Sequence, residues 1–130
     1  MERKIKILLT KVGLDAHTKG LRLLAETLQK AGMEVVQIGH YKWPKEIADA
    51  AIEKDVDMVG ISTLVANYDL VYELLGILRE KGFEKPVLVG GTIAAQHVDK
   101  LIEAGVDKVF LPGTDTDSII DYIKNRVDIS

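Results

Sequence analysis

Short apolar runs and longer amphipathic segments alternate along the whole chain. The apolar runs are rich in β-branched residues, which is typical of strands buried on both faces, and they cover residues 5–9, 33–38, 57–62, 86–89 and 106–111. In the segments between them, apolar residues recur every three or four positions, as on one side of a helix. These segments predict helices over residues 21–31, 69–81, 94–104 and 117–126, and another that begins at Pro44.

The helical period also divides the predicted helices into buried and solvated sides. On the first helix the apolar side comprises Leu21, Leu23, Leu24, Ala25 and Leu28, and on the second it comprises Ile47, Ala48, Ala51 and Ile52. Glycines stand where three of the helices should end, at Gly32, Gly82 and Gly105. His97, in a segment of mixed polarity, is expected to be exposed.

The alternation of strands and helices predicts an α/β fold with a parallel sheet and helices on both faces. We expect one domain over residues 1–130, a doubly wound five-stranded sheet of flavodoxin-like (Rossmann-like) type, with strand order 2-1-3-4-5. Ligands of such sheets bind beyond the carboxyl ends of the strands, here called the carboxyl edge, at the switch point between strands 1 and 3. The long connections at 10–20 and 63–68 flank that point, so function is expected there.

Composition narrows the possible functions. The chain has 130 residues, a net charge of −3 and no cysteine. The negative charge gives no support to nucleic-acid or anionic-membrane binding, and the lack of cysteine excludes disulfides, thiolate metal sites and a cysteine nucleophile. The first apolar run ends at Leu9, too early for a signal peptide, and no run reaches membrane-spanning length, so we expect a cytoplasmic protein.

The most informative motif, Asp15-Ala16-His17-Thr18-Lys19-Gly20, follows the first predicted strand. A neutral histidine can bind a transition metal through one ring nitrogen, while a nearby carboxylate accepts the N–H of the other nitrogen. The chain has no second cluster of metal ligands, so a metal bound at His17 would need most of its ligands from elsewhere, and a macrocycle that brings its own metal would supply them. The alternative is a solvated loop histidine beside a turn-capping Asp15.

Three further motifs end predicted strands at the same edge: Ser62-Thr63-Leu64, Gly90-Gly91-Thr92 and Pro112-Gly113-Thr114. Each has a simple structural explanation: a hydroxyl bonded to the neighbouring backbone, a glycine turn, and the start signal of the last helix. The two adjacent glycines, however, remove two Cβ atoms where a ligand should meet the sheet, which permits close approach by a flat or bulky group. Because all four motifs converge on one edge, we interpret them as one site.

This set of motifs resembles the cobalamin-binding domain of adenosylcobalamin-dependent mutases and cobalamin-dependent methyltransferases. The resemblance rests on Asp-x-His-x-x-Gly at 15–20, Ser-x-Leu at 62–64 and Gly-Gly at 90–91, and it runs over nearly the whole chain. The sequence departs from the family pattern at Ala16, at Thr18 and in segment 65–68, which is bulkier than the glycine-containing loop common in the family.

The resemblance implies a role for each matched residue. His17 would be the lower axial ligand to cobalt, displacing the dimethylbenzimidazole base of the cofactor (base-off, His-on), and Asp15 would hydrogen-bond it. Ser62 and Leu64 would line the slot for the displaced nucleotide tail, with Ser62 bonding the benzimidazole. The other expected cofactor contacts are Thr18, Gly20, Gly90, Gly91, Gly113 and Thr114.

The residues around His17 look closer to those of acyl-CoA mutases such as methylmalonyl-CoA mutase than to those of methyltransferases. Methyltransferases usually carry a helical cap domain before the cobalamin domain, and we do not expect one here, because the first predicted strand begins by about residue 4. The resemblance therefore implies the adenosylcobalamin-binding small subunit of a heteromeric isomerase, with a large (β/α)8-barrel chain that binds the acyl-CoA and covers the corrin. Alternatives are the small subunit of glutamate mutase or of a 2-hydroxyisobutyryl-CoA mutase, and a non-catalytic corrinoid carrier. A receiver-like or FMN-binding domain is disfavoured, because strand 3 ends in Ser62 and not in a phosphorylatable Asp.

Overall fold

The computed structural model describes residues 3–11, 19–39, 42–63, 67–91 and 93–127, and every structural statement below refers to these residues. They form a five-stranded sheet in the order β2-β1-β3-β4-β5, in which all neighbouring strands are parallel. The strands are β1 (Lys6–Lys11), β2 (Glu34–Gln37), β3 (Met58–Thr63), β4 (Val87–Gly91) and β5 (Lys108–Phe110). The predicted fold class and strand order are confirmed, with the switch point between β1 and β3.

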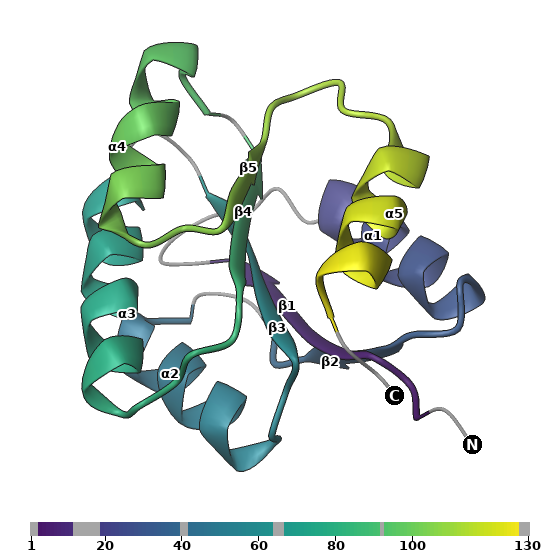
Figure 1. The fold of residues 1–130 in the computed structure, drawn as a ribbon, viewed down its shortest axis with the longest axis horizontal. Coiled ribbons are helices and arrows are strands. Elements are labelled where there is room, and N and C mark those ends of the chain that lie inside the picture. The colour runs from purple at the N-terminus through teal and green to yellow at the C-terminus, as the bar shows by residue number, and fades with distance from the viewer. Residues whose placement is uncertain (1–2, 12–18, 40–41, 64–66, 92, 128–130) are drawn as a thin grey trace.

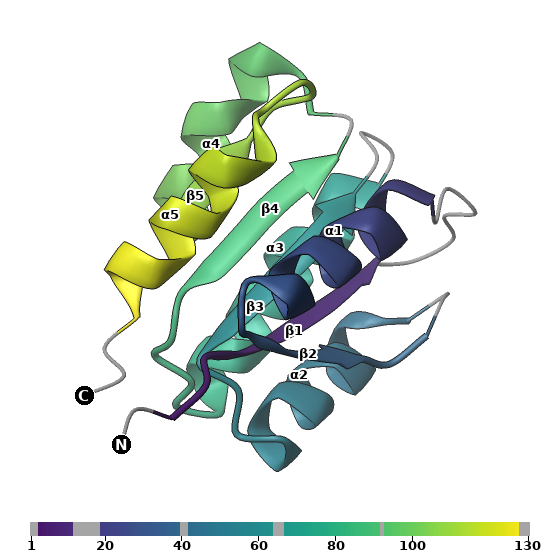
Figure 2. The same cartoon turned by 90° about the vertical axis from the view of Figure 1, so that its right-hand side faces the viewer.

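Helices cover both faces of the sheet (Figures 1 and 2). One face carries α1 (Lys19–Lys30) and α5 (Thr116–Arg126), and the other carries α2 (Pro44–Glu53), α3 (Tyr68–Glu80) and α4 (Val98–Ala104). Glycines follow α1, α3 and α4 as predicted, at Gly32, Gly82 and Gly105. None of the helices in the described ranges is long and apolar enough to cross a membrane.

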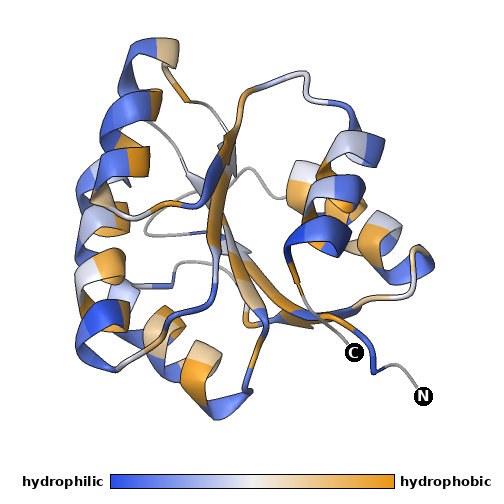
Figure 3. Ribbon diagram, viewed as in Figure 1, coloured by the Kyte–Doolittle hydropathy of each residue, from blue (hydrophilic) through white to orange (hydrophobic). Residues whose placement is uncertain are grey.

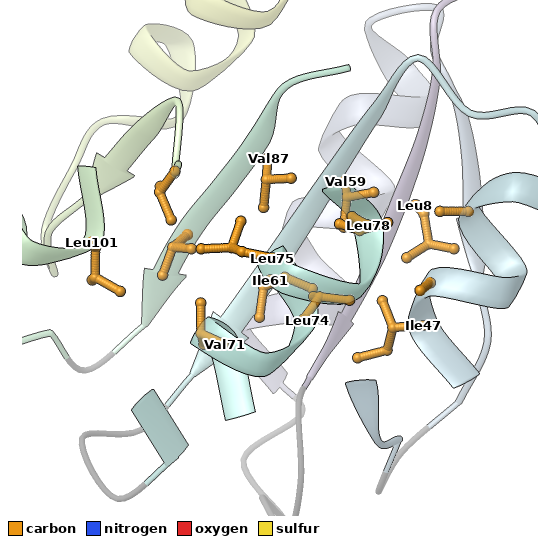
Figure 4. Close-up of a cluster of buried hydrophobic side chains, with 14 of the residues drawn as sticks. Leu8, Ile47, Val59, Ile61, Val71, Leu74, Leu75, Leu78, Val87 and Leu101 are labelled. Atoms are coloured by element: carbon orange, nitrogen blue, oxygen red, sulfur yellow. The ribbon is translucent and has the colours of Figure 1, made fainter. Parts of the chain in front are cut away.

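Two buried clusters, one on each face, hold the helices to the sheet. The larger cluster joins α2, α3 and α4 to the sheet through residues that include Leu8, Ile47, Val59, Leu74 and Leu101 (Figure 4). The other joins α1 and α5 to the opposite face through residues that include Ile7, Leu9, Leu28, Met58 and Ile123. Figure 3 shows the same pattern: hydrophobic residues (orange) are frequent in the central strands, and hydrophilic residues (blue) are frequent on the outer sides of the helices. Each large side chain buried in this way stabilises the fold by about 1.5–3 kcal/mol.

Several element boundaries differ from the prediction. β1 and β4 extend further toward the carboxyl edge, to Lys11 and Gly91, because both strands pair with β3 there. Residues 94–104 form a short 3-10 turn (Ala95–His97) before α4, where one helix was predicted. β5 is shorter than the predicted 106–111, because it is an edge strand that pairs only with β4.

Three side chains also lie differently from the sequence-based expectation. Leu23 and Ile52, both predicted to face inward, are 54% and 45% exposed, because only the centre of each apolar stripe meets the sheet. His97, predicted to be exposed, is half-buried. Its imidazole stacks on Tyr68 with 4.1 Å between ring centroids, and its Nε2 lies 2.6 Å from the hydroxyl oxygen of Tyr72.

An ion pair closes the amino edge of the sheet, opposite the expected site. The Asp57 carboxylate accepts hydrogen bonds from both Nη atoms of Arg3, at 2.6 and 2.7 Å, and from the backbone N–H of Lys6 at 2.8 Å. Burial of Asp57 opposes its ionisation, but these hydrogen bonds outweigh burial and hold the pKa of the carboxyl below its usual range. The pair therefore ties the segment before β1 to the start of β3.

Candidate functional site

A slot opens between α1 and α5 on one face of the sheet. Its volume is about 630 Å³, and it reaches from the carboxyl edge down to Ile7, Leu28 and Ile123. One wall is α1 and the other is α5, and strands β1, β3, β4 and β5 contribute its floor. The two helices lie side by side over the same face, as Figure 1 shows. The slot therefore lies beside the switch point, where open α/β sheets bind ligands.

Two glycines lower the floor of the slot. Parallel pairing places Gly60 between Leu9 and Leu88, and it places Gly90 between Ser62 and Phe110. Residues paired in this way project from the same face, so both glycines lie on the face that carries the slot. A Cβ at Gly60 would lie 2.6 Å from Cδ2 of Leu9, so the Leu9 side chain lies across the position that Gly60 leaves open. A Cβ at Gly90 would lie 3.6 Å from the carbonyl oxygen of Phe110, an ordinary contact distance.

Gly91 has a different role from its neighbour. Its φ of +106° lies in the region that favours glycine, and a Cβ there would lie 2.6 Å from the carbonyl oxygen of Thr63 and 3.1 Å from Oγ of Ser62. The backbone of β4 thus approaches the end of β3 more closely than any side chain would allow. Gly91 shapes the rim of the slot by permitting this approach, whereas Gly90 leaves its floor open.

The walls of the slot are mainly apolar. Leu21, Leu24 and Leu28 come from α1, and Ile119 and Ile123 come from α5. The hydroxyl of Thr27, also in this lining, donates to the carbonyl of Leu23 at 2.9 Å. Leu23 and Leu111 line the slot and yet are 54% and 40% exposed. An apolar wall with exposed leucines at its surface suits a flat apolar group, which would bury them.

Polar side chains gather near the mouth of the slot. Four polar residues belong to its lining and lie at or beyond the carboxyl ends of strands: Lys11, Ser62, Thr114 and Thr116. Lys11 is only 3% exposed, and it ends β1 directly before the segment that carries Asp15 and His17. Lysine is rarely buried to this degree. The arrangement fits a ligand with an apolar end in the slot and polar groups toward the carboxyl edge.

The turn after β5 forms the side of the mouth near α5. Gly113 has a φ of +88°, and Oγ1 of Thr114 donates to the carbonyl of Leu111 at 2.6 Å. The N-cap of α5 is Asp115, whose side chain accepts from the backbone N–H of Asp117, so Thr114 is not the cap residue that the simple structural explanation proposed. Thr114 instead holds the turn in shape beside the slot.

The structure brings together six of the ten cofactor contacts expected from the sequence. Gly20, Ser62, Gly90, Gly91, Gly113 and Thr114 all line the slot. Asp15, His17, Thr18 and Leu64 lie outside the described residues, so their positions stay predictions. Within the described ranges, no group of three or more His, Cys, Asp or Glu side chains could hold a metal ion.

Sequence reasoning missed several residues of the slot, among them Lys11, Leu23, Gly60, Phe110 and Ile119. Gly60 could have been found, because a glycine inside an apolar strand indicates close approach of another group. The others carry no such signal. Leucine, isoleucine and phenylalanine at these positions look like ordinary core residues until the spacing of α1 and α5 is known.

Known proteins resemble this chain over nearly its whole length. Residues 5–121 match the B12 binding domain family. The chain is 35% identical over 122 residues to the pivalyl-CoA mutase small subunit of Xanthobacter autotrophicus, covering 93% of this chain and 82% of that protein. It is 35% identical over 125 residues to the 2-hydroxyisobutanoyl-CoA mutase small subunit of Aquincola tertiaricarbonis, covering 95% of this chain and 92% of that protein. A methylmalonyl-CoA mutase of Cereibacter sphaeroides is 37% identical over 127 residues, which are 96% of this chain but only 18% of that enzyme.

Solved structures share the fold. A cobalamin-binding protein from Desulfitobacterium hafniense superimposes with a TM-score of 0.83 at 24% identity, over 97% of this chain and 60% of that one. A receiver domain of a Francisella response regulator superimposes with a TM-score of 0.75 at 17% identity, over 94% of this chain and 95% of that one. At these identities the likeness is one of fold alone, and it covers cobalamin-binding and receiver domains alike.

Proposed function

This chain belongs to the B12 binding domain family, and from that premise we propose that it is the adenosylcobalamin-binding small subunit of a mutase that rearranges the carbon skeleton of an acyl-CoA. Two relatives matched over more than nine-tenths of this chain are named as small subunits of acyl-CoA mutases. That similarity favours an acyl-CoA mutase over glutamate mutase.

The glycine-floored slot is the observation that carries the proposal. Cobalamin bound with its lower base displaced needs a place for a flat, mostly apolar benzimidazole joined to a polar ribose phosphate. The slot offers apolar walls on α1 and α5, an open floor at Gly90, and hydroxyls at its mouth. Burying the base there would stabilise the complex by several kcal/mol, at roughly 25 cal/mol per Å² of apolar area.

We assign the lower axial ligand of cobalt to His17. Its segment directly follows β1, so its side chain would come from the carboxyl edge at the switch point. Asp15 would accept the second ring N–H and fix the tautomer, which keeps the other nitrogen free for the metal. Ser62, half-buried in the lining, would hydrogen-bond the displaced base.

The catalytic acid–base groups and the acyl-CoA site belong, on this proposal, to a large partner chain with a (β/α)8 barrel. The similarity of this chain to a segment covering 18% of a complete methylmalonyl-CoA mutase supports a division of one enzyme between two chains. When bound, the cofactor would supply a weak cobalt–carbon bond whose cleavage starts the radical rearrangement. This chain would hold the corrin, orient the axial histidine and present the open face to the partner.

The test is a spectroscopic titration with adenosylcobalamin. The wild-type chain should bind it, and the cob(II)alamin complex should show an electron paramagnetic resonance splitting from an axial nitrogen. Growing the protein on the heavy nitrogen isotope should change that splitting, because the axial nitrogen would belong to the protein. His17→Ala should abolish the change, whereas the control His40→Ala should retain it.

An isotope-insensitive splitting would mean that the cofactor keeps its own base on cobalt, and the His-on assignment would be wrong. Absence of binding by the chain, both alone and together with candidate barrel subunits, would contradict the cobalamin proposal itself. Binding without isomerase activity on any acyl-CoA in the presence of those subunits would favour the corrinoid-carrier alternative.

A further inference from the structure

Helix α5 forms a whole wall of the slot, so whatever fixes α5 also fixes the width of the slot. Thr116, Ile119 and Ile123 of this helix line the slot, and α1 forms the opposite wall. α5 has 11 residues, which corresponds to a length of roughly 16 Å. A tilt of only about 4° at one end would therefore move the other end by about 1 Å.

A polar network anchors the end of α5 that is remote from the mouth. The Tyr122 hydroxyl donates to the carboxylate of Asp107, and Arg126 donates to the same carboxylate from Nε at 3.1 Å and from Nη2 at 3.0 Å. Asp107 itself is fixed to the sheet, because its backbone N–H donates to the carbonyl of Val87 at 2.8 Å. The network thus joins the last turns of α5 to the start of β4 and β5.

The protonation states of this network are stable over the physiological pH range. Burial of Asp107 opposes its ionisation, but the hydrogen bonds from Arg126 and Tyr122 outweigh burial and hold the pKa of the carboxyl below its usual range. Burial, together with the bond to Asp107, raises the pKa of Tyr122 to about 12. The anchor therefore consists of a carboxylate, a phenol and a guanidinium.

Tyr122 also contacts the floor of the slot. Its ring packs edge-on against Phe110, with 5.8 Å between ring centroids and an interplanar angle of 83°. Phe110 belongs to the slot lining, whereas Tyr122 does not. Tyr122 thus joins α5 to the sheet through its hydroxyl, and its ring supports Phe110 in the floor of the slot.

We propose that Tyr122, Asp107 and Arg126 are positioning residues that set the distance between α5 and α1 and so determine the affinity of the slot for the nucleotide tail of the cofactor. The inference rests on the proposed function. If the anchor is weakened, α5 samples positions in which the slot is too wide or too narrow. The observed Kd rises as the fraction of chains with a correctly spaced slot falls, so a tenfold fall in that fraction would raise it about tenfold.

The experiment compares two corrinoids and two matched tyrosine variants. Adenosylcobalamin carries the nucleotide tail, and adenosylcobinamide lacks it. Tyr122→Phe removes the anchoring hydroxyl but keeps the ring against Phe110. Tyr72→Phe is the control, because it removes a hydroxyl bonded to His97 on the opposite side of the sheet. Arg126→Gln, on a side chain that is 48% exposed, is a milder second variant that avoids a failure to fold.

We expect Tyr122→Phe to raise the Kd for adenosylcobalamin about tenfold and the Kd for adenosylcobinamide less than twofold. Arg126→Gln should also raise the Kd for adenosylcobalamin more than the Kd for adenosylcobinamide. Tyr72→Phe should leave the Kd for adenosylcobalamin within twofold of wild type, even if its melting temperature falls equally. The proposal is overturned if Tyr122→Phe behaves like Tyr72→Phe, or if it weakens both corrinoids equally. Failure of the wild-type chain to bind adenosylcobalamin, both alone and together with candidate barrel subunits, would instead contradict the proposed function.

Discussion

Alanine at two adjacent positions should separate ligand binding from folding. Gly90 and Gly91 are neighbours, but a Cβ at Gly90 would make an ordinary 3.6 Å contact, whereas a Cβ at Gly91 would lie 2.6 Å from the carbonyl oxygen of Thr63. Gly90→Ala should therefore project a methyl group into the slot without disturbing the sheet. Gly91→Ala should disturb the sheet itself.

The magnitudes follow from these contacts. An extra methyl group in a packed site costs about 1–3 kcal/mol, so Gly90→Ala should raise the Kd for adenosylcobalamin roughly 5-fold to 150-fold. Its free energy of unfolding should stay within about 1 kcal/mol of wild type. For Gly91→Ala, the backbone conformation and the short contact should together cost about 2–4 kcal/mol. For a domain of this size, that lowers the melting temperature by about 8–16 °C.

Thermal unfolding of the ligand-free chain by circular dichroism, and an absorbance titration with adenosylcobalamin, measure the two effects separately. An unchanged Kd for Gly90→Ala would show that the tail does not lie over this part of the floor. Equal losses of melting temperature in both variants would be incompatible with these contact distances, which place the strain at Gly91 and not at Gly90.

Three further predictions concern the slot and the amino edge. Gly60→Ala should force the Leu9 side chain toward the slot and raise the Kd for adenosylcobalamin at least 5-fold, measured by the same titration. Leu23→Ser should raise this Kd about 3-fold to 10-fold with little change in melting temperature, because Leu23 is exposed until a ligand covers it. An unchanged Kd would show that Leu23 does not contact the cofactor. The pKa of Asp57 is lower in the folded chain than in the unfolded chain, so its pair with Arg3 stabilises the fold above about pH 4 and loses that effect as the pH falls further. Urea unfolding between about pH 2 and 7 should show this loss in the wild type and a flatter profile in Asp57→Asn, and parallel profiles would contradict it.

The strand order could be predicted because it follows from local signals and a general rule. Periodicity distinguishes strands from helices, and short right-handed crossovers leave few topologies. The carboxyl ends of the strands were harder to predict. β4 reaches Gly91 because Ser62 and Thr63 of β3 pair with Gly90 and Gly91. Glycine has a low strand propensity, so the sequence of this segment alone does not indicate that it continues the strand.

The slot could be predicted only in part, because it lies between helices far apart in the chain. Motifs identified Ser62, Gly90 and Gly91, each at the end of a strand. Leu23 and Ile119 belong to the slot only because α1 and α5 lie side by side on one face. The width of such a gap depends on tertiary contacts such as those of Tyr122, which no local pattern contains.

The position of the two walls in the chain has a consequence for biosynthesis. α1 is the first helix of the described chain and α5 is its last, and the floor between them comes from strands that lie between the two in sequence. Because synthesis proceeds from the N-terminus, α1 and all five strands are made before α5. A nascent or truncated chain therefore has only one wall. A complete slot therefore requires α5 to have been synthesised, because this helix supplies the second wall.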